Sequence, residues 1–364
     1  MSTKLCGSQT ILFNNPPIIL GCGSVVGEKE GQGPYGRCFD EICMDPMIGG
    51  ESWEEGESNL ISRACNHAIA NAGVKKDDLN FAVGGDLLGQ IMATTFGVSK
   101  LDVPFLGLYG ACSTMGESLS VAGMLVDGGY SDLALAVTSS HFAGAEKQFR
   151  FPLGYGAQRP MAATWTVTGS GAVILASEEY VKKKQGNSSP EKSRGSMRSN
   201  SSSEDEKIVK VKGFTTGKIV DYGVMDSMNM GAVMAPAAAD TLFAHFKDTG
   251  TKPEDYDLVV TGDLGKVGAD ILKDFMKAKG YDLTKNHFDC GVQMYNDEEQ
   301  DTHSGGSGCG CSATLLCGYL SQELKKGKLK KILFMPTGAL LSPVSFHEGK
   351  SIPGIAHAVI LESE

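Results

Sequence analysis

The sequence predicts an α/β protein that contains two copies of one half. Three pairs of matching segments occur in the same order along its 364 residues. Each copy supplies a strand ending in Gly-Asp-Leu, a cysteine before a helix, and two later strands. This order, with apolar runs in place of strict alternation, is typical of strands that helices cover on both faces. The matching segments are Asp78–Leu87 with Asp255–Leu264, Cys112–Ser113 with Cys311–Ser312, and Ala172–Leu175 with Ala358–Leu361.

The second of these matches extends well beyond the cysteines. Cys112 and Cys311 are 199 residues apart. At this offset Gly128 aligns with Gly327 and Thr138 aligns with Thr337, so a helix, a turn and a strand are duplicated without a gap. Ser113–Asp127 carries apolar residues at helical spacing, and two glycines follow it as a stop. Leu133–Val137 and Ile332–Met335 are apolar runs of strand length.

A polar segment separates the two copies. Residues 182–206 are rich in serine and lysine and contain too few apolar residues to be buried, so we expect a disordered surface loop. This segment is either a docking or phosphorylation tail or a tolerated insertion, which costs little loop entropy. The predicted units are therefore an N-terminal half, residues 1–181, this insert, and a C-terminal half, residues 207–364.

Composition excludes several classes of protein. The net charge of −10 disfavours general nucleic-acid binding, because the phosphate backbone attracts basic proteins. The longest apolar runs are strand-sized, far short of a membrane span, and the first residues lack the apolar core of a secretory signal. The ten cysteines form no Cys-x-x-Cys pair, so we expect reduced thiols in a cytosol-like compartment, with no zinc site and no cofactor.

Cys112 is the first candidate functional residue. It follows the strand and turn Phe105–Gly110 and precedes the predicted helix Ser113–Asp127. Unpaired N–H groups and the helix dipole at that end favour an anion, so we expect a stabilised thiolate in a central pocket. The alternative is a buried cysteine that serves as a small apolar residue.

Eight blocks in the two halves carry a family resemblance: Leu108–Thr114, Thr138–His141, Glu146–Arg150, Thr168–Gly171, Met234–Asp240, Gly305–Gly308, Thr337–Pro343 and Ser351–Pro353. They resemble the stage V sporulation protein AD family, and the resemblance covers nearly the whole chain except the insert. The resemblance implies a thiolase-like fold, layered α-β-α-β-α. It also implies dipicolinic acid (pyridine-2,6-dicarboxylate) as ligand, with possible calcium, and uptake of this ligand into the developing spore. Other SpoVA membrane proteins would be partners, and a homodimer is expected. The location implied is cytoplasmic or forespore, peripheral to the spore inner membrane.

Thiolase and ketoacyl synthase chemistry needs two further polar groups, His with Asn or His with His, beside the cysteine. The resemblance places them at Thr261–Asp263 and Gly305–Cys309, and neither stretch contains histidine or asparagine. We therefore expect a catalytically degenerate protein that binds dipicolinate. Two alternatives stay open: an acyltransferase that uses Cys112, and a degenerate thiolase that acts only as a scaffold for membrane partners.

A dicarboxylate needs donors in a concave site. Arg150 and Arg159 flank a glycine-rich loop that follows His141, and they either reach the pocket or lie at a dimer contact. The glycine turn of the second half adds Gly308, Cys309 and Cys311 as pocket candidates.

Two matched aspartates complete the candidate ligand-binding residues. Asp86 and Asp263 end corresponding strands in the two halves. They either share a calcium ion with the ligand or cap the helices that follow them.

Overall fold

The computed structural model describes residues 4–149, 159–186 and 206–364. Each half contributes a five-stranded sheet, and the strands of the two sheets occur in the same spatial order. Numbered by their appearance within each half, both orders read 3-2-4-5-1. The first sheet contains β6 (Phe105–Gly107), β5 (Phe81–Gly85), β7 (Leu133–Ser140), β9 (Gly169–Ala176) and β3 (Ile18–Gly27). The second contains β12 (His287–Asp289), β11 (Leu258–Thr261), β14 (Lys331–Met335), β17 (Ala358–Ser363) and β10 (Val209–Thr215).

In each sheet the strand that comes last in the sequence, β9 or β17, runs antiparallel to both of its neighbours. The three strands beyond it run parallel to one another: β7, β5 and β6 in the first sheet, and β14, β11 and β12 in the second. Every residue of β7 and of β9 is buried, as expected from their uninterrupted apolar runs. A single residue pair between β3 and β10, Ile18 with Lys210, joins the two sheets edge to edge.

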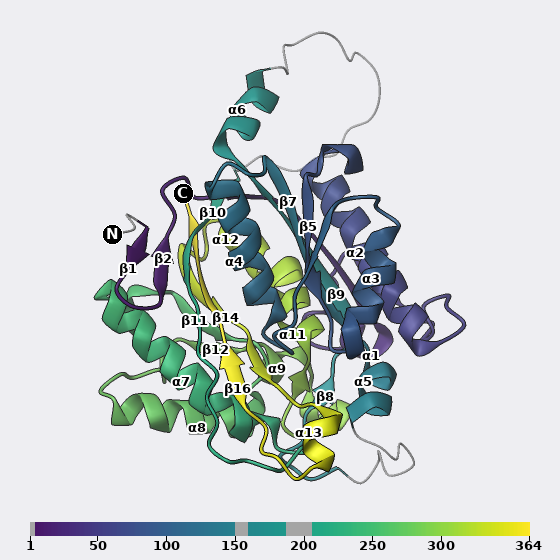
Figure 1. The fold of residues 1–364 in the computed structure, drawn as a ribbon, viewed down its shortest axis with the longest axis vertical. Coiled ribbons are helices and arrows are strands. Elements are labelled where there is room, and N and C mark those ends of the chain that lie inside the picture. Colours follow the sequence, from purple (N-terminus) through teal and green to yellow (C-terminus); the bar gives the residue numbers. More distant parts are fainter. Residues whose placement is uncertain (1–3, 150–158, 187–205) are drawn as a thin grey trace.

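The helices form three layers around these sheets (Figure 1). Two cover the outer face of the first sheet: α2 (Trp53–Ala72) and α3 (Met92–Ser99). Two cover the second sheet: α7 (Met230–Thr249) and α8 (Gly265–Ala278). Between the sheets lie α4 (Thr114–Asp127) and its counterpart, which comprises α11 (Cys309–Leu315), a π-helical turn (Leu316–Leu320) and α12 (Ser321–Lys325). The predicted layered α/β fold with duplicated halves is confirmed.

The middle layer holds the two halves together. Its core joins Met115 and Leu119 of α4 with Leu315 of α11, Val173 of β9 and Phe334 of β14. A glycine permits close packing at the start of α4, because a Cβ on Gly116 would lie 2.7 Å from the backbone oxygen of His357. The segments that carry Cys112 and Cys309 therefore meet at the centre of the molecule.

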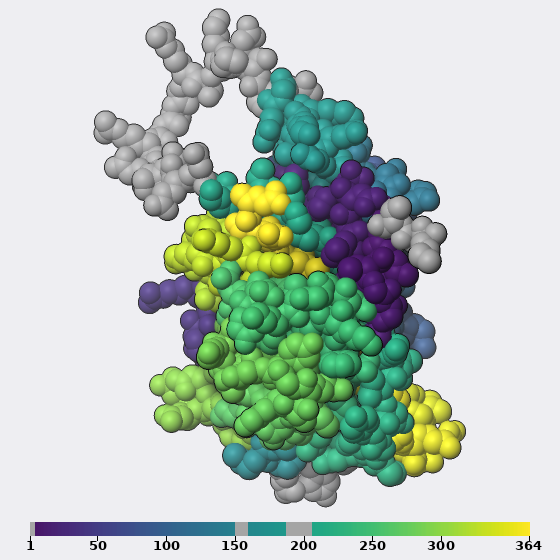
Figure 2. Space-filling model, turned by 90° about the vertical axis from the view of Figure 1, so that its left-hand side faces the viewer, coloured from purple at the N-terminus to yellow at the C-terminus, as the bar shows by residue number. Residues whose placement is uncertain are grey.

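The N-terminal residues are an exception to the division into halves. A hairpin, β1 (Leu5–Cys6) and β2 (Thr10–Leu12), pairs antiparallel with β10 of the second sheet. The Asp248 carboxylate of α7 accepts hydrogen bonds from the backbone N–H groups of residues 8–10 at 2.8–3.0 Å. In Figure 2 this N-terminal segment lies directly against the green second-half surface. The chain thus begins on the second half.

Helix α6 (Glu178–Gly186) extends into the segment that we predicted to be disordered from residue 182 onward. Charge explains the difference: glutamates occupy its first turn and lysines its last, and Lys182 pairs with Glu178 one turn back at 3.1 Å. Residues 187–205, the rest of the predicted insert, lie outside the described residues.

Short elements complete the described fold. Strands β4 (Glu41–Cys43), β8 (Trp165–Thr166), β13 (Gly306–Ser307), β15 (Thr337–Ala339) and β16 (Gly354–Ala356) form local pairs. The short helices are α1 (Glu28–Gly31), α5 (Phe142–Phe149), α9 (Cys290–Met294), α10 (Asp297–Gln300) and α13 (Pro343–His347), with single 3₁₀ turns at Gly36–Cys38, Lys76–Asp78, Gly89–Ile91 and Pro253–Asp255. None of the helices in the described ranges has the length and apolarity that crossing a bilayer requires.

Candidate functional site

A cavity of about 50 Å³ lies where the starts of α4 and α11 meet. This volume holds about four water molecules. Residues of both halves line it: Leu87, Tyr109, Ala111, Cys112, Ala145, Glu146, Phe149, Thr166, Met230, Asp263, Ser307, Gly308, Ala339 and Leu341. Tyr109, Phe149 and Leu341 also border an outer groove of about 600 Å³, which continues past Gln148 to Val344. The cavity is the inner end of a longer opening.

Cys112 lies in the cavity wall, in agreement with the expected central position. The residue before it, Ala111, has a φ of +50°, a left-handed conformation that is uncommon outside glycine. Burial raises the pKa of the Cys112 thiol well above its ordinary value, and the neighbouring Asp263 and Cys309 raise it further. The expected stabilised thiolate was therefore wrong. Helix α4 begins only at Thr114, and desolvation beside an acid outweighs the helix dipole.

Asp263 forms the second polar group of the cavity. Its two carboxylate oxygens accept hydrogen bonds from the Gly308 N–H (2.9 Å) and the Thr337 hydroxyl (2.8 Å). Burial raises the pKa of Asp263 to about 7, although these hydrogen bonds act in the opposite direction. Asp263 does not cap the following helix, because Asp289 accepts the N–H groups of Leu264 and Gly265.

Asp86, the matched residue of the first half, has a different role. Its carboxylate accepts hydrogen bonds from the Leu88 N–H (2.8 Å), the Thr94 N–H (2.7 Å) and the Thr94 hydroxyl (2.6 Å). It therefore caps the first turn of α3 and does not line the cavity. Within the described ranges, no three His, Cys, Asp or Glu side chains are grouped to hold a metal ion.

Of the three predicted residues in the glycine turn of the second half, only Gly308 lines the cavity. Gly308 lines the cavity with a φ of +99°, and a Cβ there would lie 2.6 Å from Ser140 Oγ. Cys309 is fully buried behind the cavity wall, and its thiol donates to the backbone oxygen of Ala111 at 3.3 Å. Cys311 belongs to the central core and does not line the cavity.

The predicted His141 and a second histidine near the glycine turn, His303, both lie outside the cavity. Nδ1 of His141 accepts the Ala143 N–H, so Nε2 carries the proton and donates it to the Pro46 carbonyl at 2.9 Å. His303 contacts the carbonyl of Pro160 and the carboxylate of Asp301. Neither residue is part of the cavity lining.

The arginines also differ from the expectation. Arg159 packs over the Trp165 ring and donates to the backbone oxygen of Asp301, whereas Thr166, the next residue of β8, lines the cavity. Since successive side chains of a strand point to opposite faces, Arg159 lies on the far side of β8 from the cavity. Arg150 lies outside the described residues.

Comparison with known proteins identifies the family. The sequence model of "Stage V sporulation protein AD (SpoVAD)" matches residues 7–362. This chain belongs to the stage V sporulation protein AD family. The protein of that name from Bacillus subtilis (strain 168) is 41% identical over 359 residues, which cover 99% of this chain and 98% of the relative.

Solved structures similar to this SpoVAD family member share the thiolase-like fold. The 3-oxoacyl-[acyl-carrier-protein] synthase III of Aquifex aeolicus VF5 matches 95% of this chain and 99% of its own, with a TM-score of 0.55 and 14% identity. Xanthomonas campestris OleA E117Q matches 96% of this chain and 99% of its own, with a TM-score of 0.56 and 14% identity. At this identity the similarity establishes the fold alone.

Several cavity residues of this SpoVAD family member were missed by sequence reasoning. Tyr109, Glu146 and Phe149 lie within blocks that carried the family resemblance, so a usable signal was present. Leu341 lies in another such block, Thr337–Pro343. Met230 had no such signal, because an apolar residue at a helix start is common. The described lining contains two carboxyl groups, Glu146 and Asp263, and no histidine, asparagine, lysine or arginine.

Proposed function

We propose that this chain binds dipicolinic acid in the cavity beside Cys112. In this role it supports the uptake of dipicolinate, with calcium, into the developing spore, without thiolase catalysis. The observation that carries the proposal is the polar floor of the cavity. Cys112 and Asp263 lie there in place of a reactive thiolate and its histidine and asparagine partners.

The neutral form of Asp263 is suited to an anionic ligand. With a pKa of about 7, this carboxyl retains its proton below that pH and then donates a hydrogen bond to a ligand carboxylate. Above that pH it becomes an anion and repels a dicarboxylate. Affinity for dipicolinate is therefore expected to fall as the pH rises through about 7.

The walls above this floor suit a flat ring. Tyr109, Phe149 and Leu341 border both the cavity and the outer groove, so a pyridine ring packs between apolar surfaces there. The inner cavity alone is too small for the whole ligand, and one carboxylate would lie in the outer groove. We propose that Arg150, the last residue of the block Glu146–Arg150, pairs with that second carboxylate.

We propose that calcium binds to the protein together with the ligand. No preformed cluster of acidic and histidine ligands exists among the described residues. A one-to-one chelate of Ca²⁺ with the dipicolinate dianion carries no net charge, and it suits a cavity whose described lining has no cation. We therefore propose that the chelate, rather than the free dianion, is the preferred ligand near neutral pH.

Calorimetric titration with dipicolinate, alone and with calcium, tests this proposal on the wild type and on Cys112→Ala and Asp263→Asn variants. We expect saturable binding, tighter at pH 6 than at pH 8 for free dipicolinate, with the pH dependence lost in Asp263→Asn. An acyl-CoA control with mass analysis of Cys112 separates the alternatives. Acylation without dipicolinate binding would identify an acyltransferase. If neither acylation nor dipicolinate binding is detected, the scaffold role is the one that remains.

The same proposal includes a homodimer and peripheral attachment to other SpoVA membrane proteins. The edge strand β6 supports the first part, because only β5 pairs with it among the described strands and Leu106 is 42% exposed. An unpaired apolar strand edge is a surface that another chain can cover. Sedimentation of a Leu106→Lys variant as a monomer, beside a dimeric wild type, would support pairing through this edge.

A further inference from the structure

Arg159 is buried without a full set of partners. Its side chain is only 6% exposed, and its guanidinium carbon lies 4.7 Å from the centroid of the Trp165 ring. Nη2 donates to the backbone oxygen of Asp301 at 2.7 Å. Nε and Nη1 are buried and have no hydrogen-bond partner. Buried cationic donors are costly to leave unpaired, and Nε and Nη1 both lack an acceptor.

A second cation lies at the same ring. Lys29 Nζ is 4.3 Å from the Trp165 centroid and donates to the backbone oxygen of Gln300 at 2.6 Å. Burial lowers the pKa of Lys29 and the positive charge of Arg159 lowers it further, whereas the carboxylates of Glu30 and Asp301 act in the opposite direction. Two cations thus meet at one indole, and the hydrogen-bond acceptors closest to both are uncharged carbonyl groups.

The two carboxylates near this pair are either exposed or already hydrogen-bonded to other groups. Asp301 is 82% exposed, and its Oδ2 lies 3.5 Å from Arg159 Nη2. Glu30 is buried, but its Oε1 already accepts hydrogen bonds from the Tyr295 hydroxyl and the Thr168 N–H. Burial raises the pKa of Glu30, although these hydrogen bonds act in the opposite direction.

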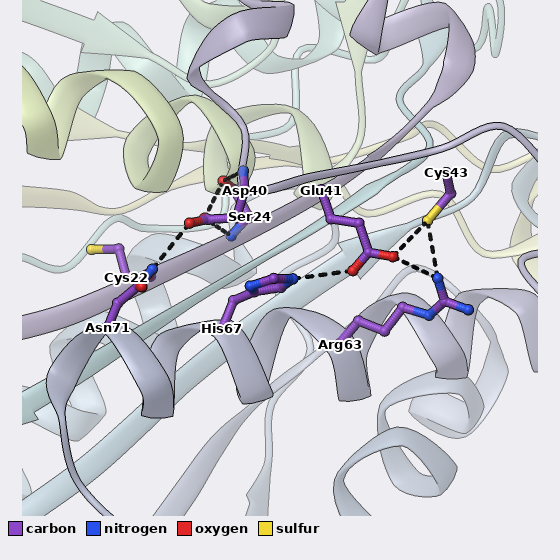
Figure 3. A network of polar contacts seen from close by, with 8 residues as sticks. All are labelled: Cys22, Ser24, Asp40, Glu41, Cys43, Arg63, His67 and Asn71. Carbon is purple, nitrogen blue, oxygen red and sulfur yellow. Dashed lines mark hydrogen bonds and ion pairs between the residues drawn. The ribbon is translucent and has the colours of Figure 1, made fainter. Parts of the chain in front are cut away.

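Arg63 shows how this chain pairs an arginine when it supplies the anion itself (Figure 3). Arg63 Nη1 lies 2.6 Å from Glu41 Oε1, and the other oxygen of Glu41 contacts His67 at 3.1 Å. Arg63 is 42% exposed, so its guanidinium needs a partner less than the buried group of Arg159. The more deeply buried arginine therefore has the more distant and the more exposed carboxylate partner.

We propose that Arg159, Lys29 and Trp165 form an oxyanion-binding site, distinct from the Cys112 cavity, for a carboxylate or phosphate group. An oxyanion supplies acceptors for Nε and Nη1 and balances two cations at once. The site is on the opposite face of β8 from the cavity, so occupation of one does not require occupation of the other. This inference does not depend on dipicolinate binding in the cavity.

The two tryptophans of the chain allow a direct test. A Trp53→Phe variant of the full chain leaves Trp165 as the only tryptophan, and its fluorescence is titrated with inorganic phosphate, acetate and chloride at constant ionic strength. We expect a saturable change with phosphate or acetate and none with chloride. The responding anion identifies the group, phosphate or carboxylate.

Matched variants in that background decide whether Arg159 is responsible. Arg159→Gln should abolish the response and Lys29→Gln should weaken the affinity several-fold, whereas Arg63→Gln and Asp263→Asn should leave it unchanged. Lys29→Gln provides the answer if Arg159→Gln does not fold. An identical response in Arg159→Gln, or none in the parent, overturns the site. Loss in Asp263→Asn would assign the anion to the cavity instead.

Discussion

Asp86 and Asp263 occupy the same place in the two halves, yet they serve different ends. Each follows a buried parallel strand, β5 or β11, in a Gly-Asp-Leu sequence. The Asp86 carboxylate accepts hydrogen bonds from three donors in and before the first turn of α3. Asp263 accepts from Gly308 and Thr337, and it faces the cavity beside the Cys112 thiol, with which it also interacts.

The following residues explain this difference. After Asp86 the chain turns through Gln90 and Ile91, both with positive φ, before α3 begins, and this turn brings Thr94 back to the carboxylate. After Asp263, α8 begins at once and Asp289 caps it from the end of β12. A duplicated sequence fixes where an aspartate lies, and its neighbours decide whether its charge is used for structure or remains available to a ligand.

The largest expected effect is the loss of stability in Asp86→Ala. This change leaves two backbone N–H groups and one hydroxyl without their buried acceptor, which costs about 3 kcal/mol. Urea unfolding measures the loss, and dipicolinate binding by the folded variant should be retained. A loss below about 1 kcal/mol would contradict the capping role.

In Asp263→Asn we expect the stability of the folded chain to depend less on pH than in the wild type. The pKa of this group is about 7 in the folded chain and 3.8 ordinarily, so the folded state holds the proton more tightly. Its contribution to stability is thus greatest below pH 4 and declines as the pH rises toward 7. The variant lacks this decline, and it should gain about 2 to 3 kcal/mol relative to the wild type between pH 5 and pH 8.

Unfolding of both proteins at the two pH values gives this difference directly, because the other acidic groups are common to both and cancel. A constant gap between variant and wild type would mean that Asp263 does not titrate in this range.

The smallest effects are expected from the hydroxyl partners. Thr94→Val and Thr337→Val each remove one hydrogen bond, worth about 1 kcal/mol, to the matched aspartates. Only Thr337→Val should also raise the pKa of Asp263, and it should shift the pH dependence of dipicolinate binding upward. If Thr94→Val shifted that dependence equally, the two aspartates would not be functionally separate.

The sequence predicted the repeated order of strands and helices because periodic apolar runs and glycine stops are local signals. Cys112, Asp263 and Gly308 were correctly placed together since all follow strands or turns that the repeat aligns. The protonated state of Cys112 was not predictable in this way. It depends on burial and on an acid from the other half, which are properties of the assembled core.

Arg159 and His141 illustrate a second limit. Both are near cavity residues in sequence. Arg159 nevertheless packs on the face of β8 opposite the cavity, and His141 is hydrogen-bonded to the carbonyl of Pro46. Which face a short strand presents is set by its partner, here β13, more than 130 residues away. A pattern within one segment does not contain that information.

The pairing of β2 with β10 has a consequence for how the chain unfolds. Because the first residues of the N-terminal half add a strand to the sheet of the second half, the second half lacks that strand when it is separated from the first. Melting should therefore follow one cooperative transition rather than two. A fragment that starts at residue 207 would expose the β10 edge at Gly213–Thr215, and adding a peptide of residues 4–13 should partly restore its stability.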